Sequence, residues 1–159
     1  MTRSLTAVDT RCSIARSLEV LGQKWSLLIV REALAGRTRY AEFRARLGIA
    51  PDVLSDRLST LVEHGILERR AYREAGERER EEYVLTEAGR DLVPVLVAML
   101  DWGDEHRPTG FGPAALHVEA ATGEPVRMAF VTEDGREVPP RDVTLTRGPG
   151  ARSEQTPAI

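Results

Sequence analysis

The chain has 159 residues, of which 42% are hydrophobic and 30% are charged, and its formal net charge is −3. This apolar content is enough for a packed core and excludes a disordered chain. No apolar run approaches the roughly 20 residues that cross a bilayer, and residues 1–11 have no apolar stretch of the signal-peptide type. The single cysteine cannot form a disulfide within the chain, and a lone thiol suits a reducing compartment. Together these features lead us to expect a soluble, cytoplasmic protein.

The charges are unevenly distributed. Residues 1–102 hold 16 basic and 16 acidic side chains, whereas residues 103–159 hold 6 and 9. Within the first part, residues 36–73 hold 8 basic and 5 acidic side chains. A small basic surface on a neutral body is weak evidence for nucleic-acid binding, because a solvated arginine surface has the same composition.

Four helices are predicted first. Apolar residues at helical spacing, with a glycine near the end of each segment, indicate helices over residues 13–21, 24–35, 40–47 and 51–64. Proline is tolerated in the first turn of a helix, which suits Pro51. The buried side of the fourth helix carries Leu54, Leu58 and Leu61.

The pattern then changes to strands. Residues 66–73 and 80–85 read as two strands, and Gly76 between them supplies the residue that a hairpin turn needs. Thr86 can cap a fifth helix over residues 87–102, in which Pro94 marks a kink.

A change in composition after Gly103 indicates a linker over residues 103–115. Val126, Met128 and Phe130 alternate as in a strand, the dipeptide at 134–135 is a hairpin turn signal, and residues 143–145 form a further short strand candidate. We therefore predict a flexible arm (1–11), a main domain (12–103), a linker with a small β extension (104–147) and a disordered tail (148–159).

Helices followed by a two-stranded hairpin form the layout of a winged helix-turn-helix, here in a mainly α fold with a small hairpin. One helix of this motif fits the major groove of duplex DNA. The same small domain can also serve only for protein–protein interaction, so the pattern alone leaves both functions open.

Three segments resemble the HxlR family of MarR-like regulators: CSIARSLEVLGQKWSLLIVREALAG, TRYAEFRARLGIAPDVLSDRLSTLVEHGILERR and EEYVLTEAGRDLVPVLVAMLDWG. They follow one another in the family's order between residues 12 and 103. The resemblance implies a transcriptional regulator that binds a palindromic operator as a homodimer and needs no cofactor. It also implies that residues 113–147 correspond to the extension of longer relatives.

The candidate DNA contacts lie on the fourth helix, before the third helix and in the wing. They are Arg39, Pro51, Asp52, Ser55, Asp56, Arg57, Ser59 and Arg80. Arg57 matches the arginine of the family's Leu-Ser-x-Arg-Leu segment. Asp52 and Asp56 fit less well, because aspartate repels phosphate; each can accept from cytosine N4 or can simply favour the helix N-terminus.

Further arginines near the third helix, Arg37, Arg44 and Arg46, are weaker candidates for phosphate contacts. The wing carries alternating arginine and glutamate and lacks the prolines of relatives. Because it is also more acidic, we expect its contact with the DNA backbone to be weak.

A palindromic site calls for a two-fold protein. The first and the long fifth helix carry more apolar surface than one small domain covers. The candidate interface residues, for which simple core packing is the alternative, are Ile14, Leu18, Leu92, Leu96, Met99, Leu100 and Trp102.

Cys12 matches the N-terminal cysteine of the family, which senses oxidants or electrophiles in some members. A redox switch at Cys12 is therefore an alternative function, and a small residue at the start of a helix is the simpler interpretation. The three histidines are scattered without metal-ligand spacing, and no phosphate loop or nucleophile motif indicates an enzyme. The extension could border a pocket for a small-molecule effector that the sequence does not identify.

Overall fold

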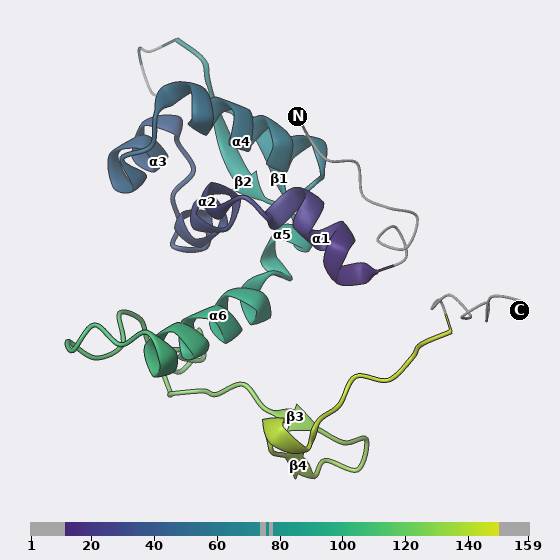
Figure 1. Ribbon diagram of the computed structural model, residues 1–159. Helices are drawn as coiled ribbons and strands as arrows, with labels where there is room; N and C mark the ends of the chain where they lie inside the picture. The colour runs from purple at the N-terminus through teal and green to yellow at the C-terminus, as the bar shows by residue number, and fades with distance from the viewer. Residues whose placement is uncertain (1–11, 74–75, 77, 150–159) are drawn as a thin grey trace, which may run out of the picture. The chain divides into compact units, whose positions relative to one another are not determined.

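A computed structural model describes residues 12–73, 76 and 78–149 (Figure 1). The predicted flexible arm, residues 1–11, lies outside the described residues, as do residues 150–159 of the predicted disordered tail. The chain divides into two compact units, the first of which contains the described residues up to Gly89, and the second Arg90–Leu145. Each unit is described by itself.

Four helices, a two-stranded sheet and a short helix make up the first unit. They are α1 (Ser13–Leu21), α2 (Lys24–Leu34), α3 (Tyr40–Leu47), α4 (Pro51–Glu63), β1 (Leu67–Tyr72), β2 (Arg80–Leu85) and α5 (Glu87–Arg90). The predicted spans of the first four helices and of both strands agree with these bounds to within one residue at each end. The mainly helical fold with a small hairpin is therefore confirmed.

The core of the first unit lies between α2, α3, α4 and β1. Its fully buried apolar side chains are Ile29, Val30, Phe43, Leu54, Leu58, Leu61 and Leu67. The three leucines of α4 form the predicted buried side of that helix. Since burying such a side chain contributes about 1.5–3 kcal/mol, this apolar face fixes which side of α4 remains outward.

The turn between α3 and α4 aims the second of these helices. Gly48 ends α3 in the left-handed conformation, with φ at 59°, and its N–H donates to the carbonyl of Arg44 at 3.0 Å. A glycine adopts this conformation without steric cost, which allows a sharp reversal. Ile49 in the turn is buried, and Pro51 occupies the first turn of α4 as predicted.

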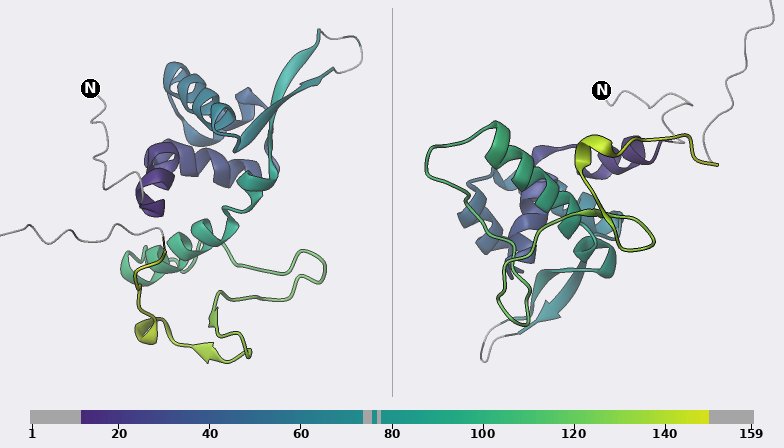
Figure 2. Two further views of the ribbon diagram at one scale, coloured as in Figure 1. Left: turned by 90° about the vertical axis from the view of Figure 1, so that its right-hand side faces the viewer. Right: turned by 90° about the horizontal axis from the view of Figure 1, so that it is seen from below.

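Strands β1 and β2 form an antiparallel hairpin, paired from Leu67 opposite Leu85 to Tyr72 opposite Arg80. The left view of Figure 2 shows the hairpin projecting beyond the helices of its unit. The N–H of Tyr83 donates to the carbonyl of Thr38 at 2.7 Å, which ties the base of the hairpin to the segment before α3. The wing is thus held against the helix-turn-helix.

The predicted fifth helix is wrong as a single element. Thr86 caps α5 as expected, because its hydroxyl accepts the N–H of Gly89 at 3.1 Å. However, α5 ends at Arg90, and a separate helix, α6 (Val93–His106), begins with Pro94 in its first turn. Proline lacks an N–H and its ring clashes with the preceding turn, so Pro94 starts a helix here instead of kinking one.

The second unit consists of α6 and the extension, with β3 (Phe130–Val131), β4 (Glu137–Val138) and a 3-10 turn at Pro140–Asp142. The predicted turn at 134–135 is confirmed, since β3 and β4 pair across it. The strand predicted over residues 143–145 is wrong, because this segment pairs with no strand among the described residues. Helix α6 takes up the start of the predicted linker.

Two polar contacts hold the extension together. His117 Nε2 lies 2.8 Å from Asp101 Oδ1 on α6, and Arg127 reaches Glu137 across the extension at 2.5 Å. The second unit has no buried core, since every described residue from Arg90 to Leu145 is at least partly exposed.

Candidate nucleic-acid interface

The outward side of α4 is the centre of the candidate interface. Asp52, Ser55 and Asp56 are exposed there, and Ser59 is half-buried one turn further along. These residues lie opposite the buried leucines because the two sets differ by half of the helical period. The structure therefore brings together four of the predicted contacts on one side of one helix.

The first turn of α4 is braced by hydroxyl groups. The Tyr40 hydroxyl and the Ser55 hydroxyl both donate to the carbonyl of Pro51, each at 2.9 Å. Tyr40 lies at the start of α3, so its hydrogen bond joins the N-terminal ends of the two helices. The hydrogen bond of Tyr40 could not be predicted from the sequence, because apolar spacing gives no sign of a partner 11 residues away.

Arg57 does not lie on the outward side. Its side chain is half-buried at the edge of α4 and its guanidinium donates to the neighbouring carboxylate of Asp56. Arg57 and Asp56 line a hollow of about 390 Å³ together with Gln23 and Trp25 from the beginning of α2. The ammonium of Lys24 lies 4.5 Å from the centre of the Trp25 ring, a cation–π contact. Through its contact with Trp25, Lys24 of α2 adds a second cationic side chain next to the hollow that Arg57 lines.

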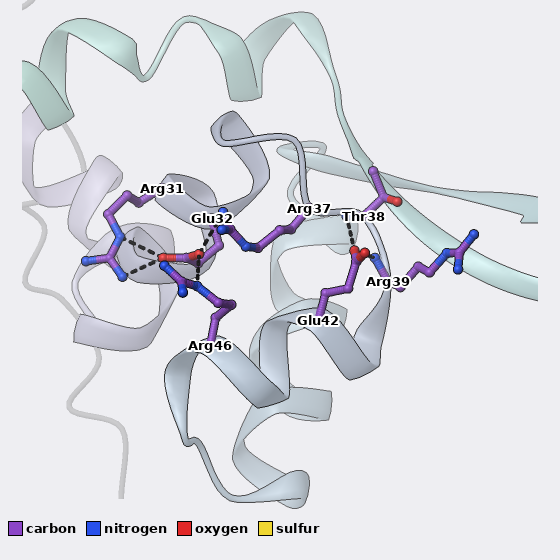
Figure 3. A network of polar contacts seen from close by, with 7 residues as sticks. All are labelled: Arg31, Glu32, Arg37, Thr38, Arg39, Glu42 and Arg46. Carbon is purple, nitrogen blue, oxygen red and sulfur yellow. Dashed lines mark hydrogen bonds and ion pairs between the residues drawn. The ribbon is translucent and has the colours of Figure 1, made fainter. Parts of the chain in front are cut away.

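Two arginines that we expected near phosphate are directed toward a buried carboxylate instead. Glu32 of α2 has a side chain that is only 5% exposed, and Arg31, Arg37 and Arg46 converge on it (Figure 3). Arg31 binds Oε1 through two nitrogens at 2.6 and 3.0 Å. Arg37 Nη1 and Arg46 Nε lie 3.1 and 3.7 Å from Oε2 without hydrogen-bond alignment, so charge alone holds them.

Arg39 and Arg44, on α3 or next to it, differ in their surroundings. The Arg39 guanidinium lies over the ring of Tyr72 in β1 at 4.7 Å, which joins the start of α3 to the wing. The side chain of Arg44 is exposed and has no hydrogen bond or ion pair with any other described residue. Among the arginines proposed near the third helix, Arg44 therefore has the most freedom to reach a phosphate.

A carboxylate caps α3. Glu42 accepts the N–H groups of Arg39 and Thr38 at 2.9 and 3.0 Å. The hydrogen bond from Arg39, followed by that from Thr38, holds the pKa of Glu42 below its ordinary value of 4.5. The ionised carboxylate thereby stabilises the helix end that lies beside Pro51.

The wing combines ion pairs with exposed arginines. Arg70 pairs with Glu68 at 3.0 Å and Arg69 lies 3.9 Å from Glu81, contacts of little energy on an exposed surface. Arg80, the predicted wing contact, is exposed opposite Tyr72. Arg73 and Arg78 are exposed and pair with no other described residue. Arg73 is absent from the predicted contacts, because the alternation of arginine with glutamate indicated the second strand of the wing instead.

The candidate dimer residues fall on different surfaces. Leu92, immediately before α6, and Leu96 and Leu100 on α6 are half-buried, whereas Met99 and Trp102 on α6 are 53% and 58% exposed. On α1, Ile14 and Leu18 are also more than half exposed. The exposed members are the ones with apolar surface still available to a partner.

Cys12 is exposed immediately before α1. Within the described residues there is no group of histidine, cysteine and acidic side chains that could hold a metal ion. No helix in the described ranges is long and apolar enough to cross a membrane.

Comparison with known proteins gives consistent relatives. The model of the HxlR-like helix-turn-helix family matches residues 20–110. An uncharacterised HTH-type transcriptional regulator of Mycobacterium tuberculosis is 41% identical over 143 residues, 89% of each chain. A solved structure of a candidate transcription factor of Pseudomonas aeruginosa has a TM-score of 0.62 and 44% identity, covering 90% of this chain and 96% of that one. The redox regulator HypR in its oxidised form has a TM-score of 0.54 and 33% identity, covering 59% of this chain and 98% of that one.

Proposed function

Because the chain belongs to the HxlR-like helix-turn-helix family, whose relatives are transcriptional regulators, we propose that it regulates transcription by binding a palindromic operator as a homodimer. The helix that enters the major groove is α4, with its N-terminal half against the bases. The observation that carries this proposal is the outward side of α4, where four side chains able to bind bases face away from the core.

The acidic character of this side makes the base contacts specific. Asp52 and Asp56 can accept a hydrogen bond from cytosine N4, and Ser59 can bind several bases. Arg57 donates to Asp56, which lowers the repulsion between that carboxylate and the phosphates. The remaining attraction comes from Arg44 beside α4 and from Arg73 and Arg78 in the wing, all exposed.

A dimer places two such surfaces on one duplex. Four apolar side chains are more than half exposed: Ile14 and Leu18 of α1 and Met99 and Trp102 of α6. Burying them in a dimer interface removes apolar surface from water and so stabilises the dimer. The second unit supports the same proposal, since it has no buried residue of its own. A regulator that binds the chromosome acts in the cytoplasm, where we place this protein.

Fluorescence anisotropy with a labelled duplex from upstream of the protein's own gene tests the proposal. Ser59→Glu adds a negative charge on the outward side of α4 and should abolish salt-sensitive binding. Ala120→Glu adds the same charge in the second unit and should bind as the unchanged protein does. Equal binding by both variants would refute the position of α4, and absence of salt-sensitive binding to any duplex would favour a domain used only for protein interaction.

A second function, redox sensing by the same regulator, is favoured by two observations. Cys12 is exposed, and the structurally similar HypR is a redox regulator. No second cysteine exists in the chain, so a disulfide would join two subunits. Treatment with diamide should release the unchanged protein from its duplex but leave Cys12→Ser bound; equal release from both removes the sensor function.

A further inference from the structure

A second concave site lies entirely within the second unit, between α6 and the extension. It is a hollow of about 680 Å³, within the range of about 300–1,000 Å³ that is usual for small-molecule sites. Trp102 and His106 form its wall on α6, and Met128, Phe130 and Pro139 form its wall on the extension. We propose that this hollow binds a bulky aromatic organic cation.

The apolar part of the hollow favours an aromatic ligand. The Trp102 and His106 rings lie 5.3 Å apart, tilted by 49°, so they present two aromatic surfaces to the same space. Trp102, Met128 and Phe130 are each 45–58% exposed. An aromatic ligand that covers these side chains removes apolar surface from water and can stack on the indole.

The charges around the hollow select a cation. Asp101, Glu105 and Glu137 line it, whereas the lining residues include one arginine, Arg127, and His106, whose Nε2 lies 3.9 Å from Glu105. Arg127 is already paired with Glu137, and this hydrogen bond lowers the pKa of Glu137, which keeps the carboxylate ionised. Glu105 is 78% exposed at the rim. An organic cation therefore meets a surplus of negative charge and the electron-rich face of Trp102.

The position of the hollow on α6 separates it from most of the proposed dimer surface. Val95 and Met99 line a different depression with Pro94 and do not line this hollow, although Ala98, Trp102 and Met128 border both. A ligand in the hollow would contact the side of Trp102 next to the extension. Its use as a signal that changes operator affinity rests on the proposed function, whereas binding itself is measured without DNA.

A matched pair of probes tests the site. Tetraphenylphosphonium and tetraphenylborate have the same shape and opposite charge, and their binding to the whole chain can be measured by isothermal titration calorimetry in sodium buffer. We expect saturable binding of the phosphonium with one site per chain, and binding of the borate weaker by about tenfold or more, a difference of 1.4 kcal/mol.

Two variants locate the site. Trp102→Leu should weaken phosphonium binding by about tenfold through loss of the aromatic face. Glu105→Gln, at a side chain too exposed to affect folding, should weaken it by about threefold. Glu63→Gln, outside the hollow and outside the proposed dimer surface, should bind as the unchanged protein does.

Three results would overturn the proposal. Equal or tighter binding of the borate would show that charge does not select the ligand. Unchanged phosphonium affinity in both Trp102→Leu and Glu105→Gln would place the ligand elsewhere. Loss of phosphonium binding at the protein concentration where sedimentation shows a dimer would assign the hollow to a second copy of the chain. Each of these outcomes leaves operator binding, and with it the proposed function, untouched.

Discussion

The guanidinium of Arg37 lies 3.1 Å from the carboxylate of Glu32, a side chain that is only 5% exposed at the end of α2. Arg31 and Arg46 approach the same carboxylate, so one negative charge opposes three positive ones. The contact joins α2 to the loop before α3 and to the end of α3. Glu32 thereby holds α3, the first helix of the helix-turn-helix, against the core.

Removing this charge should destabilise the first unit. Glu32→Gln keeps the size of the side chain but removes its charge, which leaves three guanidinium groups to repel one another. We expect a loss of about 2–3 kcal/mol in the free energy of unfolding, less than for a fully buried pair. Urea unfolding measures the loss. Glu63→Gln, an exposed change at the end of α4, should cost less than about 0.5 kcal/mol; similar losses in both variants would contradict the role of Glu32.

The capping carboxylate of α3 should make stability depend on pH. The folded-state pKa of Glu42 is lowered from 4.5, so its stabilising effect is complete above the unfolded pKa and is lost as the pH falls through the folded pKa. Glu42→Gln keeps the shape of the cap and removes the titration. The difference in unfolding free energy between the two proteins should be less than about 1 kcal/mol at neutral pH and should vanish in acid; a constant difference at all pH values would exclude the ionised cap.

Gly89 has no room for a side chain. A Cβ there would lie 2.3 Å from the carbonyl oxygen of Ile66 and 2.7 Å from Leu85 Cδ2. Gly89→Ala should therefore lower the melting temperature and cost at least about 1–3 kcal/mol. Gly103→Ala in α6 meets nothing within 4 Å, and its better helix propensity should leave stability unchanged or raise it by up to about 1 kcal/mol. Equal effects of the two changes would contradict the packing of α5 against Ile66 and Leu85.

The exposed arginine of α3 should contact a phosphate. Arg44→Gln should weaken binding to all duplexes alike and lower the slope of log affinity against log salt by about one. Arg107→Gln, an exposed arginine just after α6, is the matched control and should leave the slope as it is. A change in sequence preference with an unchanged slope would instead assign Arg44 to a base.

Short-range signals account for the part of the fold that the sequence predicts well. Pro51 begins α4, Gly48 ends α3, and the leucine spacing of α4 sets its buried side, all within one or two turns of chain. The break between α5 and α6 was missed because it depends on contacts with distant residues. Thr86 and Gly89 pack beneath Ile66, about 20 residues earlier. This contact fixes where α5 ends.

The sequence predicts where the candidate interface lies, but it does not predict how the arginines of the interface are paired. The outward side of α4 follows from helical period, and the structure places Asp52, Ser55 and Asp56 there. The state of each arginine does not follow from the sequence, because Arg46 meets Glu32 across 14 residues and Arg39 meets Tyr72 across 33. Pairing between elements decides which guanidinium is left to bind DNA.

Selection of bound duplexes from random DNA tests the central claim most directly, because it reports binding, symmetry and half-site spacing together. The account predicts a two-fold consensus with half-sites about 10 base pairs or a multiple apart, and a consensus that changes when Asp52→Asn and Asp56→Asn alter the outward side of α4. Enrichment of no sequence, or of an asymmetric sequence that these two variants still select, would contradict it.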